Sequence, residues 1–69
     1  MITISEDRII RVKKGEELEG KKIVCNFDYD VIDKGDIGTI EYTKSRGLWY
    51  EVAVCNFNDT ILELRILRE

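Results

Sequence analysis

Two alternating stretches limit most strongly what this chain can fold into. In Leu48–Asn56 (LWYEVAVCN) and Thr60–Leu67 (TILELRIL), apolar residues recur at every second position, which is the period of a β-strand with one buried face. Asn58 and Asp59 lie between the two stretches and are typical of a turn. The sequence therefore predicts two strands joined by a turn. A spacing of 3.6 residues also fits the second stretch, so a helix is the alternative there.

Charged residues indicate which face of each predicted strand is buried. Glu51 lies on one face of the first strand, so we expect that face, with Ala53 and Cys55, to point outward. The expected core face of this strand comprises Tyr50, Val52 and Val54. Glu63 and Arg65 mark the outward face of the second strand in the same way. Its expected core face comprises Leu62, Leu64 and Ile66.

Upstream of this pair, three more strands are predicted from apolar and β-branched residues. They are Arg8–Lys13, Lys22–Phe27 and about 36–43, and the short alternation in Met1–Ser5 can add an N-terminal strand. The polar connector between the first two strands carries Leu18, which we expect to anchor it to the core. In the third strand, Ile40 and Tyr42 are expected to face the same way.

Three glycines mark the expected turns. Gly35 and Gly38 flank the junction between an acidic loop and a strand, where glycine supplies a positive φ or permits close approach of another backbone. Residues 44–47 (KSRG) have the composition of a hairpin turn, with Gly47 as its left-handed residue.

Composition limits the size and the chemistry of the protein. The chain has 69 residues, 43% of them hydrophobic, and a net charge of −3, which indicates one small domain that buries a modest core. It has no histidine, so the commonest general base and metal ligand are missing. Two cysteines without an export signal or a membrane span predict a cytoplasmic protein with reduced thiols.

The acidic loop and the two cysteines are candidate chemical sites. Asp28, Asp30, Asp33 and Asp36 invite comparison with a cation-binding loop. Counted from Asp28, however, the sixth and twelfth positions hold Asp33 and Thr39 instead of the required glycine and glutamate. We therefore expect a solvated loop and no metal. Cys25 and Cys55 are predicted on opposed faces, which argues against a disulfide. No nucleophile elbow or phosphate loop is present, so we expect a non-enzyme without a cofactor.

Several segments together resemble a known fold family. Gly20–Val24 (GKKIV), Lys34–Ile40 (KGDIGTI) and Tyr50–Val54 (YEVAV), followed by a leucine-rich final strand, resemble SH3-like barrels of the KOW type and small bacterial or phage families that share this turn. The resemblance covers Gly20 to Leu67. It implies an all-β fold, a small five-stranded SH3-like barrel that an extra N-terminal strand can extend. KOW domains bind RNA, ribosomal proteins or transcription proteins, so it also implies a binding role.

Three functional hypotheses follow. The first is a protein-binding adaptor or modulator of a larger bacterial or phage assembly. Its contact residues would be Trp49, Tyr29, Asp30 and Asp33, because an exposed tryptophan is a frequent hot spot. Trp49 can instead fold over the end of the barrel and close the core, and the sequence leaves both positions open.

The second hypothesis is a nucleic-acid-binding module. Its basic patch would comprise Lys21, Lys22, Lys44 and Arg46, and Trp49 or Tyr29 would stack on bases. The third hypothesis is a homodimer that pairs an exposed strand edge.

Overall fold

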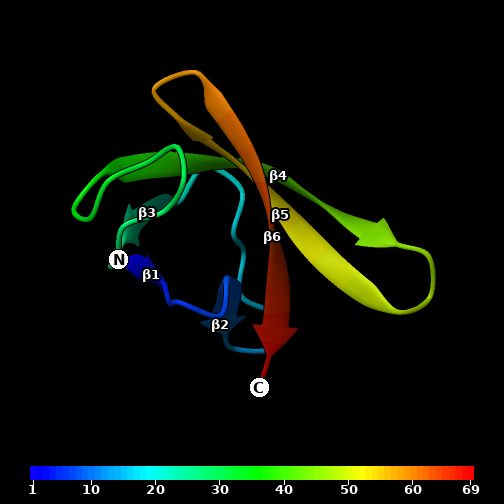
Figure 1. The fold of residues 1–69 in the computed structure, drawn as a ribbon. Coiled ribbons are helices and arrows are strands. Elements are labelled where there is room, and N and C mark those ends of the chain that lie inside the picture. Colours follow the sequence, from blue (N-terminus) through cyan, green and yellow to red (C-terminus); the bar gives the residue numbers. More distant parts are fainter.

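Six β-strands form one mixed sheet in the computed structural model, which describes residues 1–69 (Figure 1). The strands are β1 (Ile2–Ile4), β2 (Ile9–Val12), β3 (Lys22–Cys25), β4 (Ile37–Arg46), β5 (Tyr50–Phe57) and β6 (Thr60–Arg68). The expected all-β fold is confirmed, and so is the additional N-terminal strand. The final segment is a strand and not the alternative helix. No helix of the structure is long and apolar enough to cross a membrane.

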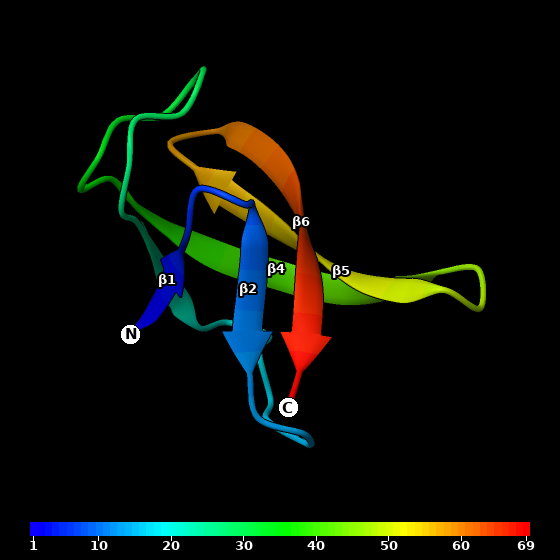
Figure 2. The ribbon, with the colours of Figure 1, turned by 60° about the horizontal axis from the view of Figure 1, so that its bottom comes forward.

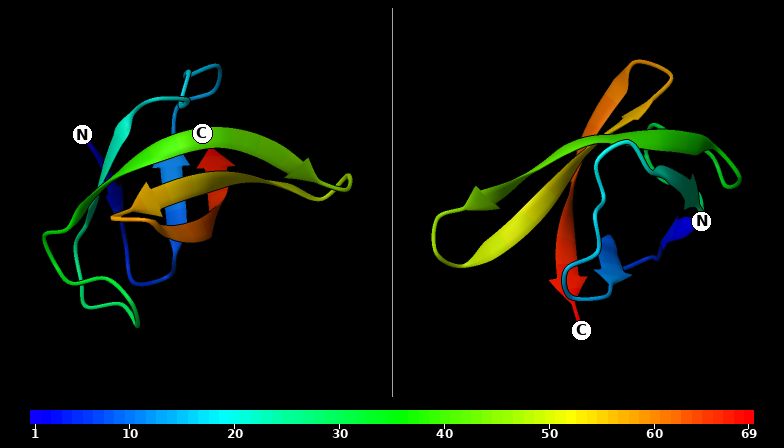
Figure 3. Two further views of the ribbon diagram at one scale, coloured as in Figure 1. Left: turned by 90° about the horizontal axis from the view of Figure 1, so that it is seen from above. Right: turned by 180° about the vertical axis from the view of Figure 1, so that it is seen from behind.

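The order of the strands in the sheet is β1-β3-β4-β5-β6-β2. Strands β3 to β6 form antiparallel pairs, whereas β1 runs parallel to β3 and β2 runs parallel to β6. The two strands at the edges are therefore the first two of the chain. Strong bending of the sheet brings them side by side (Figures 2 and 3), but they share no backbone ladder. The result is a small barrel that stays open between β1 and β2.

The core lies inside the bent sheet and takes side chains from every strand. Leu18 is 1% exposed, so the polar connector between β2 and β3 is anchored as expected. The acidic loop between β3 and β4 contributes Ile32, which is also buried. The other buried core residues are Ile4, Ile10, Val12, Ile23, Cys25, Ile40, Ala53, Cys55, Phe57, Leu64 and Ile66. The expected core face of β6 is confirmed, with Leu62 packed at its margin.

The prediction of which face of β5 is buried is wrong. Its core face carries Ala53, Cys55 and Phe57, while Tyr50, Val52 and Val54 point to the other side of the sheet. Glu51 shares the core-facing row, but it lies at one end of the barrel, where Arg68 Nε donates a hydrogen bond to its Oε1 at 3.0 Å. A charged residue can occupy this row because Arg68 pairs with it at this end of the barrel. The charge of Glu51 was therefore a misleading indicator of the outward face.

A β-bulge changes the face of the residues along β4. Ile40 pairs with Cys55 and Tyr42 pairs with Val54, so Glu41 has no partner between them. An extra residue in one strand reverses which side the following side chains occupy. Ile40 is consequently buried, whereas Tyr42 is 46% exposed on the outside. The expectation that both residues face the same way is wrong for this reason.

The three glycines serve the two purposes expected of them. Gly35 and Gly47 have φ values of 95° and 63°, which suits glycine. Gly38 lies under Phe57, and a Cβ atom there would stand 2.7 Å from Phe57 Cδ2. Strand β4 continues through Arg46, so the hairpin turn comes later than expected and begins at Gly47.

Candidate functional site

The hairpin of β4 and β5 extends away from the barrel (Figure 3). Its tip carries two exposed apolar side chains. Leu48 is fully exposed and Trp49 is 86% exposed. The turn is closed by a hydrogen bond from the Trp49 amide to the Arg46 carbonyl at 3.4 Å. A Cβ atom at Gly47 would stand 3.4 Å from Trp49 Cδ1, so the indole lies against the glycine. Trp49 is therefore exposed at the tip and does not close the end of the barrel.

Below the tip, one side of β4, β5 and β6 faces away from the core. Residues directly opposite each other in a ladder point to the same side of the sheet. We call this side the outer face, and it comprises Tyr42, Lys44, Arg46, Tyr50, Val52, Val54, Glu63 and Arg65. Val52 and Val54 are at most 5% exposed. Their neighbours across the two ladders are aromatic or long polar side chains, namely Tyr42, Lys44, Glu63 and Arg65. These side chains lie over the two valines, so the outer face has an apolar layer beneath a polar one.

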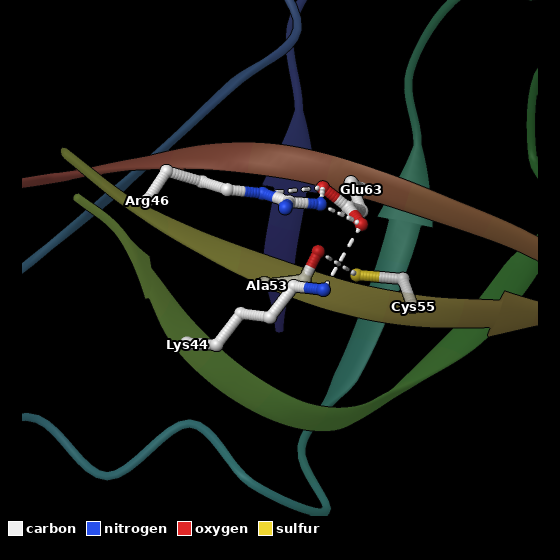
Figure 4. Close-up of polar contacts among 5 residues, drawn as sticks. All are labelled: Lys44, Arg46, Ala53, Cys55 and Glu63. Atoms are coloured by element: carbon white, nitrogen blue, oxygen red, sulfur yellow. Dashed lines mark hydrogen bonds and ion pairs between the residues drawn. The ribbon is translucent and has the colours of Figure 1, made fainter.

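Glu63 connects the outer-face cations of β4 to β6 across β5 (Figure 4). Arg46 donates to both carboxylate oxygens, with Nε 3.2 Å from Oε1, and Lys44 Nζ lies 3.3 Å from Oε2. The hydrogen bonds from Arg46 lower the pKa of Glu63 below its usual range, and Lys44 adds to the effect. The same contact raises the pKa of Arg46. Both shifts favour the ionised forms of Glu63 and Arg46, and this ion pair ties the β4–β5 hairpin to β6.

A shallow hollow continues the outer face toward β2. It has a volume of about 470 Å³, and Tyr50, Val52 and Arg65 form one side of it, while Arg8 and Ile9 form another. The Arg65 guanidinium lies 5.1 Å from the centre of the Tyr50 ring, a cation–π arrangement. An otherwise acidic chain therefore presents a surface where cations and aromatic rings outnumber carboxylates.

The structure does not bring the four predicted protein-binding residues together. Trp49 is at the hairpin tip, whereas Tyr29, Asp30 and Asp33 lie in the loop between β3 and β4 at the opposite end of the molecule (Figures 1 and 2). The Tyr29 ring packs 5.5 Å from that of Phe27 and lies 4.3 Å beneath the Arg8 guanidinium. One flat contact cannot include both ends.

The predicted basic patch is also divided. Lys44 and Arg46 belong to the outer face, where they share Glu63. Lys21 and Lys22 lie at the start of β3 beside the opening between β1 and β2. Lys22 Nζ donates to Thr39 Oγ1 at 2.9 Å. The two pairs of cations therefore serve different surfaces.

The aspartates of the acidic loop hold the loop's own backbone. Asp28 Oδ1 accepts a hydrogen bond from the Lys34 amide at 3.2 Å, and Asp36 Oδ2 accepts one from the Asp33 amide at 2.9 Å. The structure has no group of three or more histidine, cysteine or acidic residues placed to hold a metal ion.

Both cysteines are free and buried in the core, so the expected outward position of Cys55 is wrong. Its Sγ lies 3.8 Å from the Ala53 carbonyl oxygen, which accepts the weak thiol hydrogen bond (Figure 4). Burial raises the pKa of the Cys55 thiol to about 12. A thiol without thiolate character is a poor nucleophile, so Cys55 contributes packing and no chemistry.

Sequence reasoning missed Tyr42 and Tyr50 as residues of the outer face, and it placed Arg65 on the outward side of β6 without assigning it to a site. The positions of Tyr42 and Tyr50 depend on the bulge at Glu41 and on the face of β5, which the sequence pattern assigned incorrectly. A usable signal was present in the alternation of charges, because Glu63 and Arg65 lie two residues apart on the outward side of β6.

The fold and the outer face define a small open β-barrel with an exposed aromatic and basic surface. Comparisons of the chain with protein-family models, with curated protein sequences and with solved structures give no match. The resemblance to SH3-like barrels of the KOW type therefore stays a prediction.

Proposed function

We propose that this protein is a non-enzymatic protein-binding module that contacts its partner with the hairpin tip and the outer face. The observation that carries the proposal is the exposure of Leu48 and Trp49 at the tip of the β4–β5 hairpin. Ion pairs with Glu63 tie this hairpin to β6. Large exposed apolar side chains that adjoin a polar rim are typical of interaction sites. Tryptophan, tyrosine and arginine are also the residues that most often supply binding energy at interfaces.

The charges of the outer face indicate the chemistry of the partner. Lys44, Arg46 and Arg65 surround the buried valines, and Glu63 is the nearest carboxylate. A complementary surface would offer an apolar pocket for Trp49 and carboxylates for the cations at its edge. Such a module fits the role of an adaptor or modulator within a larger bacterial or phage assembly.

The test compares crosslinking at the two ends of the molecule. A photo-crosslinking amino acid is placed at position 49 in one variant and at position 31 in another, since Val31 is also exposed but lies in the acidic loop. The proposal expects one defined protein adduct from position 49 in a nuclease-treated bacterial lysate, and none from position 31. Adducts from position 31 alone would contradict it.

Affinity for the captured protein supplies the second measurement. Trp49→Ala should weaken binding by roughly 30-fold or more, the loss of about 2 kcal/mol expected at a hot spot. Val31→Ala is the matched control and should leave affinity unchanged. Circular dichroism must show that both variants are folded. Equal affinity of the two variants would remove Trp49 from the contact.

A nucleic-acid-binding module is the second candidate, and the stacking of Arg65 on Tyr50 beside Lys44 and Arg46 favours it. Phosphate contacts make affinity fall steeply as salt rises. A single-stranded oligonucleotide titrated at low and at moderate salt tests the idea, with Arg65→Ala as the variant. Absence of binding at low salt would exclude this candidate.

A further inference from the structure

The second half of strand β4 has a neighbouring strand on only one side. Strand β3 pairs with β4 at Ile37–Thr39 alone, and the Ile40 amide then donates to the Lys21 carbonyl at 2.9 Å. From Tyr42 to Arg46, β4 has β5 along one edge and no strand along the other. We call this unpaired side of Tyr42–Arg46 the free edge of β4. Edge strands carry backbone groups that can pair with another chain.

Thr43 and Ser45 direct their backbone groups to the free edge. The Arg46 carbonyl accepts a hydrogen bond from the Trp49 amide in the closing turn, so the backbone of Arg46 points toward β5. Successive residues of a strand direct their backbone groups to alternate sides. Thr43 and Ser45 therefore point their N–H and C=O groups away from β5. None of the backbone hydrogen bonds formed outside the strand ladders involves either residue.

The free edge has room for another strand. Apart from β3 and β5, no strand of the sheet comes near β4. The connector before β3 is hydrogen-bonded to β4 only at Ile40, through Gly20 and Lys21. Beyond that point the hairpin extends away from the barrel (Figure 3), and the Ser45 side chain is exposed. A strand added about 4.8 Å from β4 would therefore occupy solvent.

On the outer face, the side chains beside the free edge favour carboxylates. Lys44 and Arg46 share Glu63, which lies two strands away on β6 (Figure 4). Glu63 accepts hydrogen bonds from Nε and Nη2 of Arg46, which leaves Nη1 without a partner. Glu41, in the bulge at the inner end of this stretch, already accepts a hydrogen bond from Asn56 Nδ2 at 3.1 Å. A carboxylate on an added strand would thus lie next to two cations that share one counter-charge.

The opposite face beside the free edge disfavours carboxylates. The side chains of Thr43 and Ser45 point to this side, and Ser45 lies opposite Glu51. Arg68 Nε lies 3.0 Å from Glu51 Oε1, and Arg68 Nη1 donates to the Glu16 carbonyl at 2.9 Å. The single cation on this side is therefore already paired, and the connector that carries Glu16 lies beside it. An added strand needs uncharged side chains here.

A second copy of the chain does not meet these requirements. In the antiparallel register that pairs Thr43 of one copy with Ser45 of the other, Lys44 lies directly opposite Lys44 of the second copy. Like charges directly opposite each other destabilise a strand pair, and lysine on an edge strand is a common protection against self-pairing. The charges therefore favour a segment of a different protein.

We propose that the free edge of β4 binds an extended segment of the partner protein as an added strand, in which carboxylates alternate with uncharged side chains. Backbone pairing with Thr43 and Ser45 positions the segment, and the alternate side chains select it. Its carboxylates contact Lys44 and Arg46 on the outer face. The segment ends beside Trp49, so this inference rests on the protein-binding function proposed above and specifies the form of the partner.

The probe is a seven-residue peptide of alternating glutamate and threonine with blocked ends, titrated into the ¹⁵N-labelled protein and followed by NMR. We expect chemical shift changes centred on Thr43 and Ser45, and slower amide exchange of these two residues in the complex. Absence of both changes would overturn the proposal. A peptide with lysine in place of glutamate should not bind, and equal binding of this peptide would refute the selection by charge.

The peptide is also prepared with N-methyl groups either on all its glutamates or on all its threonines. Successive amides of a strand point to alternate sides, so only one of the two sets faces β4. One methylated peptide should bind like the parent, and the other should bind at least about tenfold more weakly because its hydrogen bonds to β4 are lost. Affinities that do not differ would refute strand addition.

Two variants at position 45 test the edge of the protein itself. Ser45→Pro removes an N–H that faces solvent, and an edge strand tolerates proline at such a position. Ser45→Ala keeps the N–H and is the matched control. Ser45→Pro should weaken binding of the parent peptide at least about tenfold, whereas Ser45→Ala should leave it nearly unchanged. Circular dichroism must show that both variants are folded, and equal affinities would refute the site.

Crosslinking separates this inference from the proposed function. A photo-crosslinking amino acid at position 45 should form an adduct with the same protein as one at position 49. An adduct from position 49 without one from position 45 would refute strand addition and leave the function intact, whereas no adduct from position 49 contradicts the function itself. Protection of the Thr43 and Ser45 amides that rises with protein concentration alone would show that a second copy occupies the edge, which also refutes the inference.

Discussion

Replacing Gly38 by alanine tests the packing of the barrel at its tightest point. The φ of Gly38 lies outside the left-handed region, so alanine meets no backbone strain there. In the interior of a strand, alanine is otherwise favoured over glycine by about 0.5–1 kcal/mol. The space around the added Cβ atom therefore decides whether Gly38→Ala stabilises or destabilises the protein. The added Cβ would stand 2.7 Å from Phe57 Cδ2 and 2.8 Å from the Asn56 carbonyl oxygen.

The expected loss follows from what these two atoms can do. The Phe57 ring is 1% exposed and fixed within the core, and the Asn56 oxygen belongs to the β5 backbone, so neither moves freely. Overpacking of this kind costs about 1–3 kcal/mol. A domain of this size unfolds with about 3–10 kcal/mol in total. A loss of 2 kcal/mol would lower Tm by about 8–16 °C.

Urea unfolding followed by far-ultraviolet circular dichroism measures the change. Gly35→Asn is the control, because Gly35 has a positive φ and open space around it, and asparagine tolerates that conformation. In a Phe57→Leu background, the cost of Gly38→Ala should shrink by at least about 0.5 kcal/mol, since contacting residues couple. It should not vanish, because the Asn56 oxygen remains. An unchanged or higher midpoint for Gly38→Ala would refute the reasoning.

Three further outcomes are expected. Trp49→Ala should change the unfolding free energy by less than about 0.5 kcal/mol, and acrylamide should quench this exposed tryptophan nearly as well in the folded protein as in urea. Because burial raises the pKa of Cys55 from 9.0 to about 12, the unfolded chain loses the thiol proton first as pH rises. Stability should then fall above pH 9 by up to about 1.4 kcal/mol per pH unit, and Cys55→Ala should flatten this slope in urea titrations at pH 8 and 10. The lowered pKa of Glu63 stabilises the fold above its ordinary value of 4.5, so the difference in urea midpoint between the wild type and Glu63→Gln should shrink as pH falls below that value; a constant difference would exclude the ion pair as its cause.

Local patterns in the sequence located the strands and the core face of β6, but they gave the wrong buried face for β5 and the wrong side for Tyr42 of β4. The period-two alternation located the strands, and Leu18 was correctly expected to anchor its connector. The charge of Glu51 gave the wrong face of β5, because the distant Arg68 partners it at the barrel end. The bulge at Glu41 reversed the expected side of Tyr42, and a single extra residue leaves no trace in the alternation.

The candidate site depended on tertiary placement even more. Trp49 was identified from its residue type, but the distance between the hairpin tip and Tyr29 is set by how the sheet bends. The division of the lysines between two surfaces has the same cause. Which side chains share a surface depends on contacts between residues far apart in sequence, and a local pattern contains no information about those contacts.

The parallel pairing of β2 with β6 also constrains how the chain folds as it is synthesised. Ile9 pairs with Arg65 and Val12 with Arg68. Strand β2 is therefore synthesised early but can pair only after β6 has been synthesised. The antiparallel hairpins of β3 to β6 need only local contacts, whereas pairing between distant segments is slow. On the ribosome, β2 stays without its partner until residues 65–68 have left the exit tunnel. A nascent chain that is stalled earlier therefore exposes both edges of an unclosed sheet to chaperones and to other nascent chains.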